Sequence, residues 1–335
     1  MGAMARIAIN GFGRIGRSTL KAGWGRSGFD VVAINDLTDA ATLAYLLQHD
    51  TNYGMWDVDV KVGKNMLVID GVKIPIYAEK DPSTLPWKKL KVDVVIESTG
   101  FFVTEEGAMA HIKAGAKRVV ISAPAKGGNV PTYVLGVNGD HLAHESAAIL
   151  NNASCTTNSV APVTEVMDRV FGVKKAMLTT VHGMTASQSL VDSPKKDVRE
   201  GRAASQNIIP TTTGAAIAVT QTLPQLVGKF DGLSIRVPIS TVSLSDMTFV
   251  LKKKVTKEDV NNALIAASKS KRYLGILGVS HEPLVSSDYI GDPHSCIVDL
   301  ALTNVVDGDL VKVVAWYDNE WGYANRLCEL ALTIG

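Results

Sequence analysis

The chain contains little of what marks secreted, membrane-bound or nucleic-acid-binding proteins. It has three cysteines in 335 residues, and their odd number and wide spacing argue against a disulfide framework and for a reducing compartment. The net charge of only +1 argues against electrostatic binding of nucleic acid or of an anionic membrane. No apolar run reaches the roughly 18 residues of a membrane-spanning helix, and the N-terminus lacks the pattern of a signal peptide. We therefore expect a cytoplasmic protein.

The sequence also lacks internal repeats and low-complexity tracts, and it suggests no metal site. Its composition, 46% hydrophobic and 20% charged residues, is ordinary for a globular protein. A chain of 335 residues is long enough for about two domains of roughly 150 residues each. We therefore expect two hydrophobic cores.

Short apolar strands alternate with helix-like segments in the first half of the chain. The predicted strands cover residues 7–9, 31–34, 92–96 and 119–121, and the predicted helices cover residues 15–24, 40–47 and 105–114. Nearly continuous apolar strands joined by helices predict a parallel sheet covered on both faces, an α/β doubly wound fold. Residues 55–76 instead alternate with period two, which predicts small antiparallel strands inserted into this domain.

The second half of the chain has a different pattern of apolar and polar residues. Predicted strands cover residues 176–181, 234–242, 248–254, 296–302 and 311–316, and predicted helices cover residues 214–223, 260–268 and 323–332. This pattern predicts an α+β domain with a mixed or antiparallel sheet. Residues 183–208 carry few apolar anchors and many charges, and such a long loop is usually functional or forms contacts.

A glycine-rich turn follows the first strand. Gly11, Gly13 and Gly16 form a G-x-G-x-x-G pattern that opens a helix, where glycines let the backbone approach a pyrophosphate at the helix start. Asp36 follows the second strand, where a carboxylate accepts the ribose hydroxyls of NAD and repels the 2′-phosphate of NADP. The alternative is a structural turn with a solvated aspartate. Residues 98–100 follow another strand and fit a cofactor contact or a structural turn equally well.

A lone thiol lies in the first turn of a predicted helix, within residues 153–158. The free N–H groups and partial positive charge of a helix start favour the thiolate of Cys155, which is the nucleophilic form. His182, at the end of a predicted strand, is a candidate general base. The alternatives are a buried, inert cysteine and a structural histidine. Cys296 and Cys328 fit the core.

Two further features suggest anion binding. Residues 209–214 place hydroxyls and free N–H groups at the start of another helix, a second anion site with an ordinary N-cap as the alternative. Arg236 lies in a predicted strand, which is an unusual place for arginine unless it has a partner such as phosphate.

Together these residues resemble the phosphorylating glyceraldehyde-3-phosphate dehydrogenases, and the likeness runs from about Arg6 to the C-terminus. The most specific segments are residues 9–17, 153–158, 208–214 and 316–320. The resemblance implies Cys155 as nucleophile and His182 as its base. It implies a Rossmann-type NAD-binding domain over residues 4–153, joined by a C-terminal helix over residues 319–335, and a catalytic domain over residues 154–318.

The resemblance also assigns binding residues. Those implied around NAD are Gly11, Gly13, Arg14, Ile15, Gly16, Asp36, Lys80, Ser122 and Asn319, with Asn319 at the nicotinamide amide. Those implied for inorganic phosphate are Ser154, Thr156, Thr213, Gly214 and Arg202, and those implied for the substrate's own phosphate are Thr185 and Arg236. The implied assembly is a homotetramer in which the loop over residues 183–208 reaches a neighbouring subunit's cofactor.

The implied reaction is the oxidation of glyceraldehyde 3-phosphate to 1,3-bisphosphoglycerate. The Cys155 thiolate would form a hemithioacetal, hydride would pass to NAD, and inorganic phosphate would release the resulting thioester. Covalent capture fixes the hydride donor in place, and such positioning contributes roughly 7–11 kcal/mol.

The sequence departs from the family pattern in three places. Ser159 replaces a frequent second cysteine. Met184 alters the segment after His182, while Ser187 keeps a hydroxyl there. Ser193 precedes Pro194, at a position where NAD-preferring members commonly have leucine. The last change makes dual use of NAD and NADP possible, although we expect NAD.

Two rival functions remain open. Residues 292–295 and 324–326 are similar to erythrose-4-phosphate dehydrogenases, which work without phosphorolysis, whereas residues 212–214 keep the inorganic-phosphate subsite. The other rival, a catalytically silent NAD-binding regulator, is disfavoured by Cys155, His182 and Arg236 together.

Overall fold

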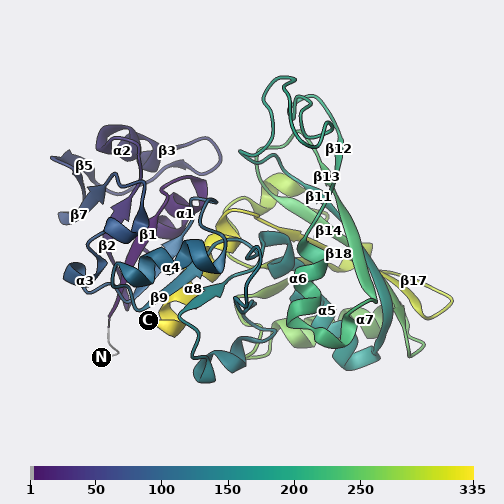
Figure 1. The fold of residues 1–335 in the computed structure, drawn as a ribbon. Coiled ribbons are helices and arrows are strands. Elements are labelled where there is room, and N and C mark those ends of the chain that lie inside the picture. Colours follow the sequence, from purple (N-terminus) through teal and green to yellow (C-terminus); the bar gives the residue numbers. More distant parts are fainter. Residues whose placement is uncertain (1–3) are drawn as a thin grey trace. The chain divides into compact units, whose positions relative to one another are not determined.

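The computed structural model describes residues 4–335, which form two compact units. The first unit comprises the described residues up to Tyr133, together with Asp140–Ala153 and Ala324–Gly335, and the second comprises Val134–Gly139 and Ser154–Tyr323. Each unit has its own large sheet, as Figure 1 shows.

The sheet of the first unit has eight strands in the order β10-β9-β8-β1-β2-β7-β6-β5. The strands are β1 (Ala5–Asn10), β2 (Phe29–Asn35), β5 (Val60–Gly63), β6 (Met66–Ile69), β7 (Val72–Tyr77), β8 (Val94–Glu97), β9 (Arg118–Ile121) and β10 (Ile149–Asn151). The strands from β10 to β7 run parallel, whereas β5, β6 and β7 pair antiparallel. The predicted Rossmann-type sheet with an antiparallel insertion is confirmed.

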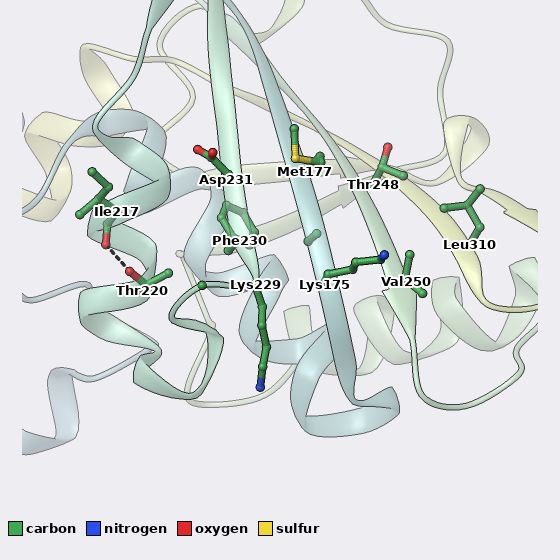
Figure 2. Close-up of a pocket in the computed structure, with 12 residues that line it drawn as sticks. Lys175, Met177, Ile217, Thr220, Lys229, Phe230, Asp231, Thr248, Val250 and Leu310 are labelled. Carbon is green, nitrogen blue, oxygen red and sulfur yellow. Dashed lines mark hydrogen bonds between the residues drawn. The ribbon is translucent and has the colours of Figure 1, made fainter.

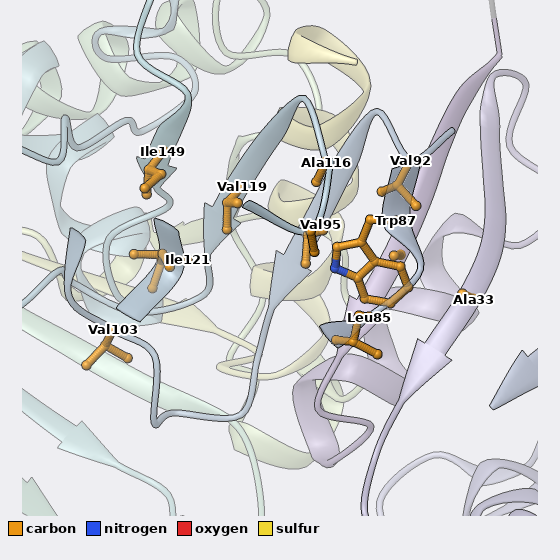
Figure 3. Packing of buried hydrophobic residues seen from close by; sticks show 13 residues of the cluster. Ala33, Leu85, Trp87, Val92, Val95, Val103, Ala116, Val119, Ile121 and Ile149 are labelled. Atoms are coloured by element: carbon orange, nitrogen blue, oxygen red, sulfur yellow. The ribbon is translucent and has the colours of Figure 1, made fainter. Parts of the chain in front are cut away.

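The helices of the first unit connect these strands. They are α1 (Arg14–Gly23), α2 (Ala40–Gln48), α3 (Trp87–Leu90), α4 (Glu105–Lys113) and the greater part of α8 (Trp321–Ile334), and a small hairpin joins β3 (His49–Asp50) to β4 (Gly54–Met55). Strand side chains are buried because helices cover the sheet. In Figure 3, Trp87 lies among Leu85, Val92 and Val95, all almost completely buried.

The sheet of the second unit is mixed. Its strands follow the order β12-β13-β11-β14-β18-β16-β15, with β17 beside β18. They are β11 (Val173–His182), β12 (Ile209–Thr212), β13 (Phe230–Arg236), β14 (Ser243–Leu251), β15 (Leu277–Ser280), β16 (Cys296–Asp299), β17 (Asn304–Val306) and β18 (Leu310–Tyr317). The pairs β11–β13 and β15–β16 are parallel and the others antiparallel. Helix α5 (Cys155–Phe171) packs against this sheet, beside α6 (Ala215–Thr222) and α7 (Lys257–Ser268).

Three predicted strands of this unit have different bounds in the structure. The prediction over residues 234–242 is wrong beyond Arg236, where Pro238 lacks the N–H that a strand needs. Strand β14 begins at Ser243 and ends before the predicted residues 252–254. The prediction over residues 296–302 covers β16 and a short 3₁₀ turn, whose start is capped by the Asp299 side chain. Periodicity located these strands but could not locate their ends.

The predicted helix near the C-terminus is present as α8. Its Ala324, Leu327, Leu330 and Ala331 are 0% exposed, as the helical spacing predicted. Across residues 4–335, we find no helix that combines the length and the apolar character needed to span a bilayer.

Candidate functional site

The thiol of Cys155 lies at the beginning of α5. Ser154 is the N-cap: its backbone is extended, and its Oγ accepts a hydrogen bond from the backbone N–H of Thr157 at 3.0 Å. Ala153, just before it, has a φ of 53°, a left-handed conformation that is uncommon for a residue with a side chain. This turn makes Cys155 the first helical residue, as predicted.

His182 is paired with this thiol. It ends β11, and its Nε2 lies 3.5 Å from Cys155 Sγ. Its Nδ1 lies 2.7 Å from the carbonyl oxygen of Gly183. A carbonyl oxygen can only accept, so Nδ1 carries the proton and the neutral ring presents the lone pair of Nε2 to the thiol. The geometry fits transfer of a proton from sulfur to Nε2.

Burial sets the resting charge of the pair. Burial raises the pKa of the Cys155 thiol, although the Arg236 charge and hydrogen bonds from Thr156 act in the opposite direction. Burial and the Arg236 charge lower the pKa of His182 to about 3. Desolvation therefore opposes the predicted effect of the helix start, whose free N–H groups favour the thiolate. Both shifts favour a thiol beside a neutral imidazole.

Arg236 supplies an unpaired cation beside the pair. It ends β13 and lies opposite His182 in the parallel register with β11. Its Nε and Nη1 are buried without a hydrogen-bond partner among the described residues. Buried donors without partners are costly, and a planar guanidinium matches the geometry of phosphate or carboxylate. An anion of the substrate would satisfy both atoms.

Tyr317 was not predicted as part of the site. It is 1% exposed, and its hydroxyl lies 2.9 Å from Thr156 Oγ1 and 3.0 Å from Thr180 Oγ1. Its ring meets the His182 ring edge-on at 6.1 Å. Burial raises the pKa of this phenol, so it remains neutral and holds Thr156 in place. The sequence signal was its position at the end of an apolar strand, within a segment that carried the resemblance.

Asn319 is held by a second residue that the sequence did not reveal. It is 4% exposed, and its Oδ1 accepts from Ser243 Oγ at 2.9 Å. The same Ser243 Oγ accepts from the backbone N–H of Gly183 at 3.1 Å. The carboxamide of Asn319 is thus linked to the residue that follows His182.

The residues predicted to bind phosphate in the second unit make fewer contacts with one another than Cys155 and its neighbours do. Gly214 is the N-cap of α6 without a side-chain cap, and Thr213 Oγ1 accepts from the backbone N–H of Ala215 at 3.1 Å. Thr185 Oγ1 lies 2.9 Å from Ser187 Oγ. Arg202 is exposed and forms an ion pair with Asp192 at 3.0 Å. In the described part of the chain, no hydrogen bond or ion pair brings Arg202 to the thiol or to α6.

The predicted dinucleotide turn lies at the end of β1. Gly11 has a φ of +88°, and a Cβ on Gly16 would lie 2.2 Å from the carbonyl oxygen of Gly11, so both positions need glycine. A Cβ on Gly13 would meet nothing within 4 Å, and Gly13 is the N-cap of α1 without a side-chain cap. The first N–H groups of α1 are therefore available to an anion.

Asp36 faces this turn. Its Oδ2 accepts from the backbone N–H of Phe12 at 2.7 Å, and its Oδ1 accepts from that of Thr38 at 2.9 Å. Arg14 forms an ion pair with Asp50 at 2.8 Å and lies over a tyrosine ring.

The other cofactor candidates of this unit have fewer contacts. Ile15 is half-buried, Lys80 is exposed, and the backbone N–H of Ser122 donates to the carbonyl oxygen of Glu97 at 2.9 Å.

A large concave surface lies away from all of these residues. It encloses about 690 Å³ on β11, β13 and β14, and it is mainly apolar. Figure 2 shows Met177 and Phe230 projecting from neighbouring strands. Met177 and Ile217 are 59% and 66% exposed. None of the predicted site residues lines this surface.

Two family models match the chain. The model described as "Glyceraldehyde 3-phosphate dehydrogenase, NAD binding domain" matches residues 5–105, and the one described as "Glyceraldehyde 3-phosphate dehydrogenase, C-terminal domain" matches residues 154–319. Similar proteins include a glyceraldehyde-3-phosphate dehydrogenase of Geobacillus stearothermophilus, 49% identical over 98% of both chains. Another, from Priestia megaterium, is 50% identical over 97% of both chains. The chloroplastic enzyme GAPA1 of Arabidopsis thaliana is 48% identical over 98% of this chain and 83% of that protein.

Proposed function

The chain belongs to the glyceraldehyde-3-phosphate dehydrogenase family, and we propose that it oxidises D-glyceraldehyde 3-phosphate with NAD and forms 1,3-bisphosphoglycerate. The observation that carries this proposal is the 3.5 Å pairing of Cys155 Sγ with His182 Nε2 at the start of α5. The unpaired guanidinium of Arg236 beside this pair supports a phosphorylated substrate.

Cys155 is the nucleophile in the proposed mechanism. His182 Nε2 accepts the proton of the thiol, and the sulfur forms a bond with the aldehyde carbon. Backbone N–H groups at the start of α5 and the protonated His182 stabilise the oxygen that becomes negative. His182 then returns the proton to that oxygen, which completes a hemithioacetal.

Oxidation and phosphorolysis follow on the same sulfur. His182 takes the hydroxyl proton of the hemithioacetal, which becomes a thioester. NAD, when bound, supplies the acceptor for the hydride. Inorganic phosphate then attacks the thioester carbon, and the carbon–sulfur bond breaks to release the acyl phosphate and free Cys155.

Two sets of residues would bind the substrate's own phosphate and inorganic phosphate. Arg236 and Thr185 would hold the substrate's own phosphate. The proposed inorganic-phosphate residues combine the start of α5 with the start of α6, and Arg202 would join them after leaving Asp192. They are Ser154, Thr156, Arg202, Thr213 and Gly214.

The first unit fits NAD. The open start of α1 at Gly13 suits the pyrophosphate, and the carboxylate of Asp36 suits the ribose hydroxyls. The remaining proposed contacts are Gly11, Arg14, Ile15, Gly16, Lys80, Ser122 and Asn319. Because Asp36 repels a 2′-phosphate, we propose NAD as the preferred cofactor. Ser193 leaves some use of NADP open.

We further propose a cytoplasmic homotetramer. Its nucleotide-binding domain would be residues 4–153 with the helix of residues 319–335, and its catalytic domain residues 154–318. The loop over residues 183–208 exposes Leu190, Val191 and Val198 by 80%, 70% and 79%. Large exposed apolar side chains commonly mark an interface, and the apolar surface of Figure 2 has the same character.

Initial rates test the proposal. Purified protein is given glyceraldehyde 3-phosphate with NAD or NADP, with and without inorganic phosphate. We expect NAD to be preferred, steady turnover to require phosphate, and Cys155→Ser to lose several orders of magnitude in rate while retaining NAD binding. Cys296→Ser, a buried cysteine of β16, is the matched control and should retain activity.

Other outcomes would identify the rivals. Undiminished turnover without phosphate, together with a preference for erythrose 4-phosphate, would indicate the related dehydrogenase. NAD binding with no oxidation of either aldehyde would indicate a silent regulator.

A further inference from the structure

A carboxylate is buried under the dinucleotide turn of the first unit. Glu97 ends β8, and it is 1% exposed. Among residues 4–335, no lysine or arginine forms an ion pair with it, and its one ring partner is His111. Removing a carboxylate from water is costly unless hydrogen-bond donors surround it. The proposed chemistry does not use this group.

Four donors surround Glu97. Its Oε2 accepts from Asn10 Nδ2 at 2.5 Å and lies 3.0 Å from His111 Nε2. Its Oε1 accepts from the backbone N–H of Thr99 at 2.8 Å and from the hydroxyl of the same residue. A protonated acid would have to donate one of these bonds, whereas the anion accepts all four. The donor set therefore matches an ionised carboxylate.

The orientation of His111 is fixed from its other side. Trp87 Nε1, which can only donate, lies 3.0 Å from His111 Nδ1. Nδ1 is therefore the acceptor, and in the neutral ring the proton sits on Nε2, facing Glu97. Trp87 and His111 are both 0% exposed, so water cannot replace either partner.

A second branch runs through two asparagines. Asn10 Oδ1 accepts from Asn35 Nδ2 at 2.7 Å, and Asn35 Oδ1 accepts from the backbone N–H of Glu79 at 2.9 Å. The backbone donor of Glu79 fixes which side-chain atom of Asn35 is the oxygen, and Asn35 fixes Asn10 in the same way. Asn10 must then present its NH₂ group to Glu97.

The members of this network stand directly before the proposed cofactor residues. Asn10 precedes Gly11, Asn35 precedes Asp36, and Glu79 precedes Lys80. The network therefore ties together the ends of β1, β2 and β8 and the segment after β7.

The turn itself rests on residues that Glu97 holds. A Cβ on Gly11 would lie 2.6 Å from the backbone N of Thr99, so the two backbones are in close contact. Ser98 Oγ donates to the carbonyl oxygen of Gly11 at 2.7 Å. A shift of Thr99 or Asn10 would therefore move the glycine turn.

We propose that Glu97 is a positioning residue for NAD: its ionised carboxylate, fixed by His111, Asn10 and Thr99, holds the glycine turn and the Asp36 strand end in the shape that binds the dinucleotide. This inference rests on the proposed use of NAD. Glu97 does not contact the reacting atoms, so its effect is on cofactor affinity rather than on the chemical step.

Glu97→Gln tests the proposal with almost no change in volume. The new NH₂ group would face Asn10 Nδ2 or the N–H of Thr99, so donor would meet donor. We expect the Kd of NAD, measured by titration calorimetry, to rise roughly 10- to 100-fold. The KM for NAD should rise in parallel, while kcat at saturating NAD and the KM for the aldehyde change less than about 2-fold.

Tyr133→Phe is the matched control. It removes the hydrogen bond of another partly buried carboxylate of the same unit, from Tyr133 to Glu145 at 2.7 Å, and it should leave the Kd of NAD unchanged. If Glu97→Gln lowers the melting temperature as Tyr133→Phe does but leaves the Kd of NAD unaltered, the role is merely structural and the proposal is overturned.

His111 gives a second test in case Glu97→Gln does not fold. In His111→Gln the side-chain N–H can donate to Glu97 and the side-chain oxygen can accept from Trp87, so the Kd of NAD should stay within about 3-fold of wild type. In His111→Leu both bonds are lost, and the Kd should rise roughly 10-fold. Equal affinities of these two variants would contradict the proposal.

The result for the wild type separates the two hypotheses. If the wild-type protein does not bind NAD, the proposed function fails. If it binds NAD and oxidises the aldehyde while both Glu97→Gln and His111→Leu bind as the wild type does, only the positioning role fails.

Discussion

The charge of Arg236 acts on both members of the Cys155–His182 pair. It lowers the pKa of the thiol and the pKa of the imidazole, while burial raises the first and lowers the second. Near neutral pH these shifts therefore favour a neutral His182 ring and a protonated Cys155 thiol. Burial thus favours a pair that becomes charged when substrate arrives, rather than a standing ion pair, and Arg236 offsets part of the effect of burial on the thiol.

Alkylation of Cys155 by iodoacetamide should reflect this arrangement. We expect the rate to climb steadily with pH from neutrality to above pH 9, without a plateau at low pH, because the thiolate is the reactive form. Arg236→Leu removes a charge that lowers the thiol pKa, so the rate at pH 8 should fall at least about 3-fold. Lys229→Met, an exposed charge of the same unit, should have no effect. A pH-independent rate below pH 6 would show a standing thiolate.

The neutral His182 also makes stability depend on pH. Its pKa is about 3 in the folded chain and about 6.5 in the unfolded chain, so the unfolded chain binds the extra proton between these values. Lowering the pH through this window therefore reduces the free energy of unfolding, by up to about 1.4 kcal/mol per pH unit from this group. Denaturant unfolding at pH 7 and pH 5 should show a smaller loss for His182→Asn than for the wild type. An equal loss of stability in both proteins would mean that protonation of His182 does not cause this pH dependence.

Which residues come together in the site was harder to predict than the position of each residue in its own element. Cys155 could be placed at a helix start because the cap residue and the strand before it are local signals. Local patterns made His182 and Arg236 candidates, but their pairing with Cys155 depended on the family resemblance, because strand pairing across long sequence distances brings them together. Asn319 depended on the resemblance alone. Ser243 and Glu97 carried no local signal, and a local pattern does not report the burial that raises the pKa of the Cys155 thiol.

At the scale of the element, the N-cap of α5 has two functions that can be separated. Ser154 caps the helix and is a proposed inorganic-phosphate residue, whereas Thr256 caps α7 through a reciprocal pair with Asp259. Ser154→Ala and Thr256→Ala should each cost about 0.5–2 kcal/mol of stability, measured by chemical unfolding. Only Ser154→Ala should also raise the KM for inorganic phosphate, by roughly 10-fold. Equal phosphate kinetics in both variants would remove Ser154 from the phosphate subsite.

Elements were predictable wherever periodicity extended over a whole segment. The helices α1, α2, α4 and α8 agree closely with their predicted ranges, and the side chains of Asp39 and Thr104 cap the starts of α2 and α4. The predicted strand ends were wrong near residues 237–242, where Pro238 cannot donate to a strand, and at residues 252–254, which lie beyond the last paired residue of β14.

At the scale of the molecule, the exposed apolar side chains predict self-association. We expect sedimentation to give about four times the chain mass of 35.7 kDa. The double substitution Leu190→Asp with Val198→Asp places charge on two side chains that are 80% and 79% exposed, so it should leave folding intact while lowering the mass. Lys252→Asp, on the exposed rim of the same unit, controls for added negative charge. A wild-type monomer would contradict the proposed tetramer.

The division into a parallel and a mixed sheet was predictable because the hydrophobic pattern of the predicted strands changes near Cys155. The assignment of Val134–Gly139 to the second unit was not, because its packing depends on a distant arginine: Arg272 Nε donates to the carbonyl oxygen of Gly136 at 2.6 Å. A sequence pattern shows where an element forms, and such distant contacts decide which core it joins.

The placement of Ala324–Gly335 in the first unit has a consequence for how the protein is made. The strands of that unit emerge from the ribosome early, whereas the helix that supplies Leu327 and Leu330 to its core is translated after the strands of the second unit. Domains usually fold as they emerge, from the N-terminus onwards. Here a ribosome stalled anywhere before Ala324 would hold a nucleotide unit that cannot yet close its core, so synthesis of the second unit must precede completion of the first.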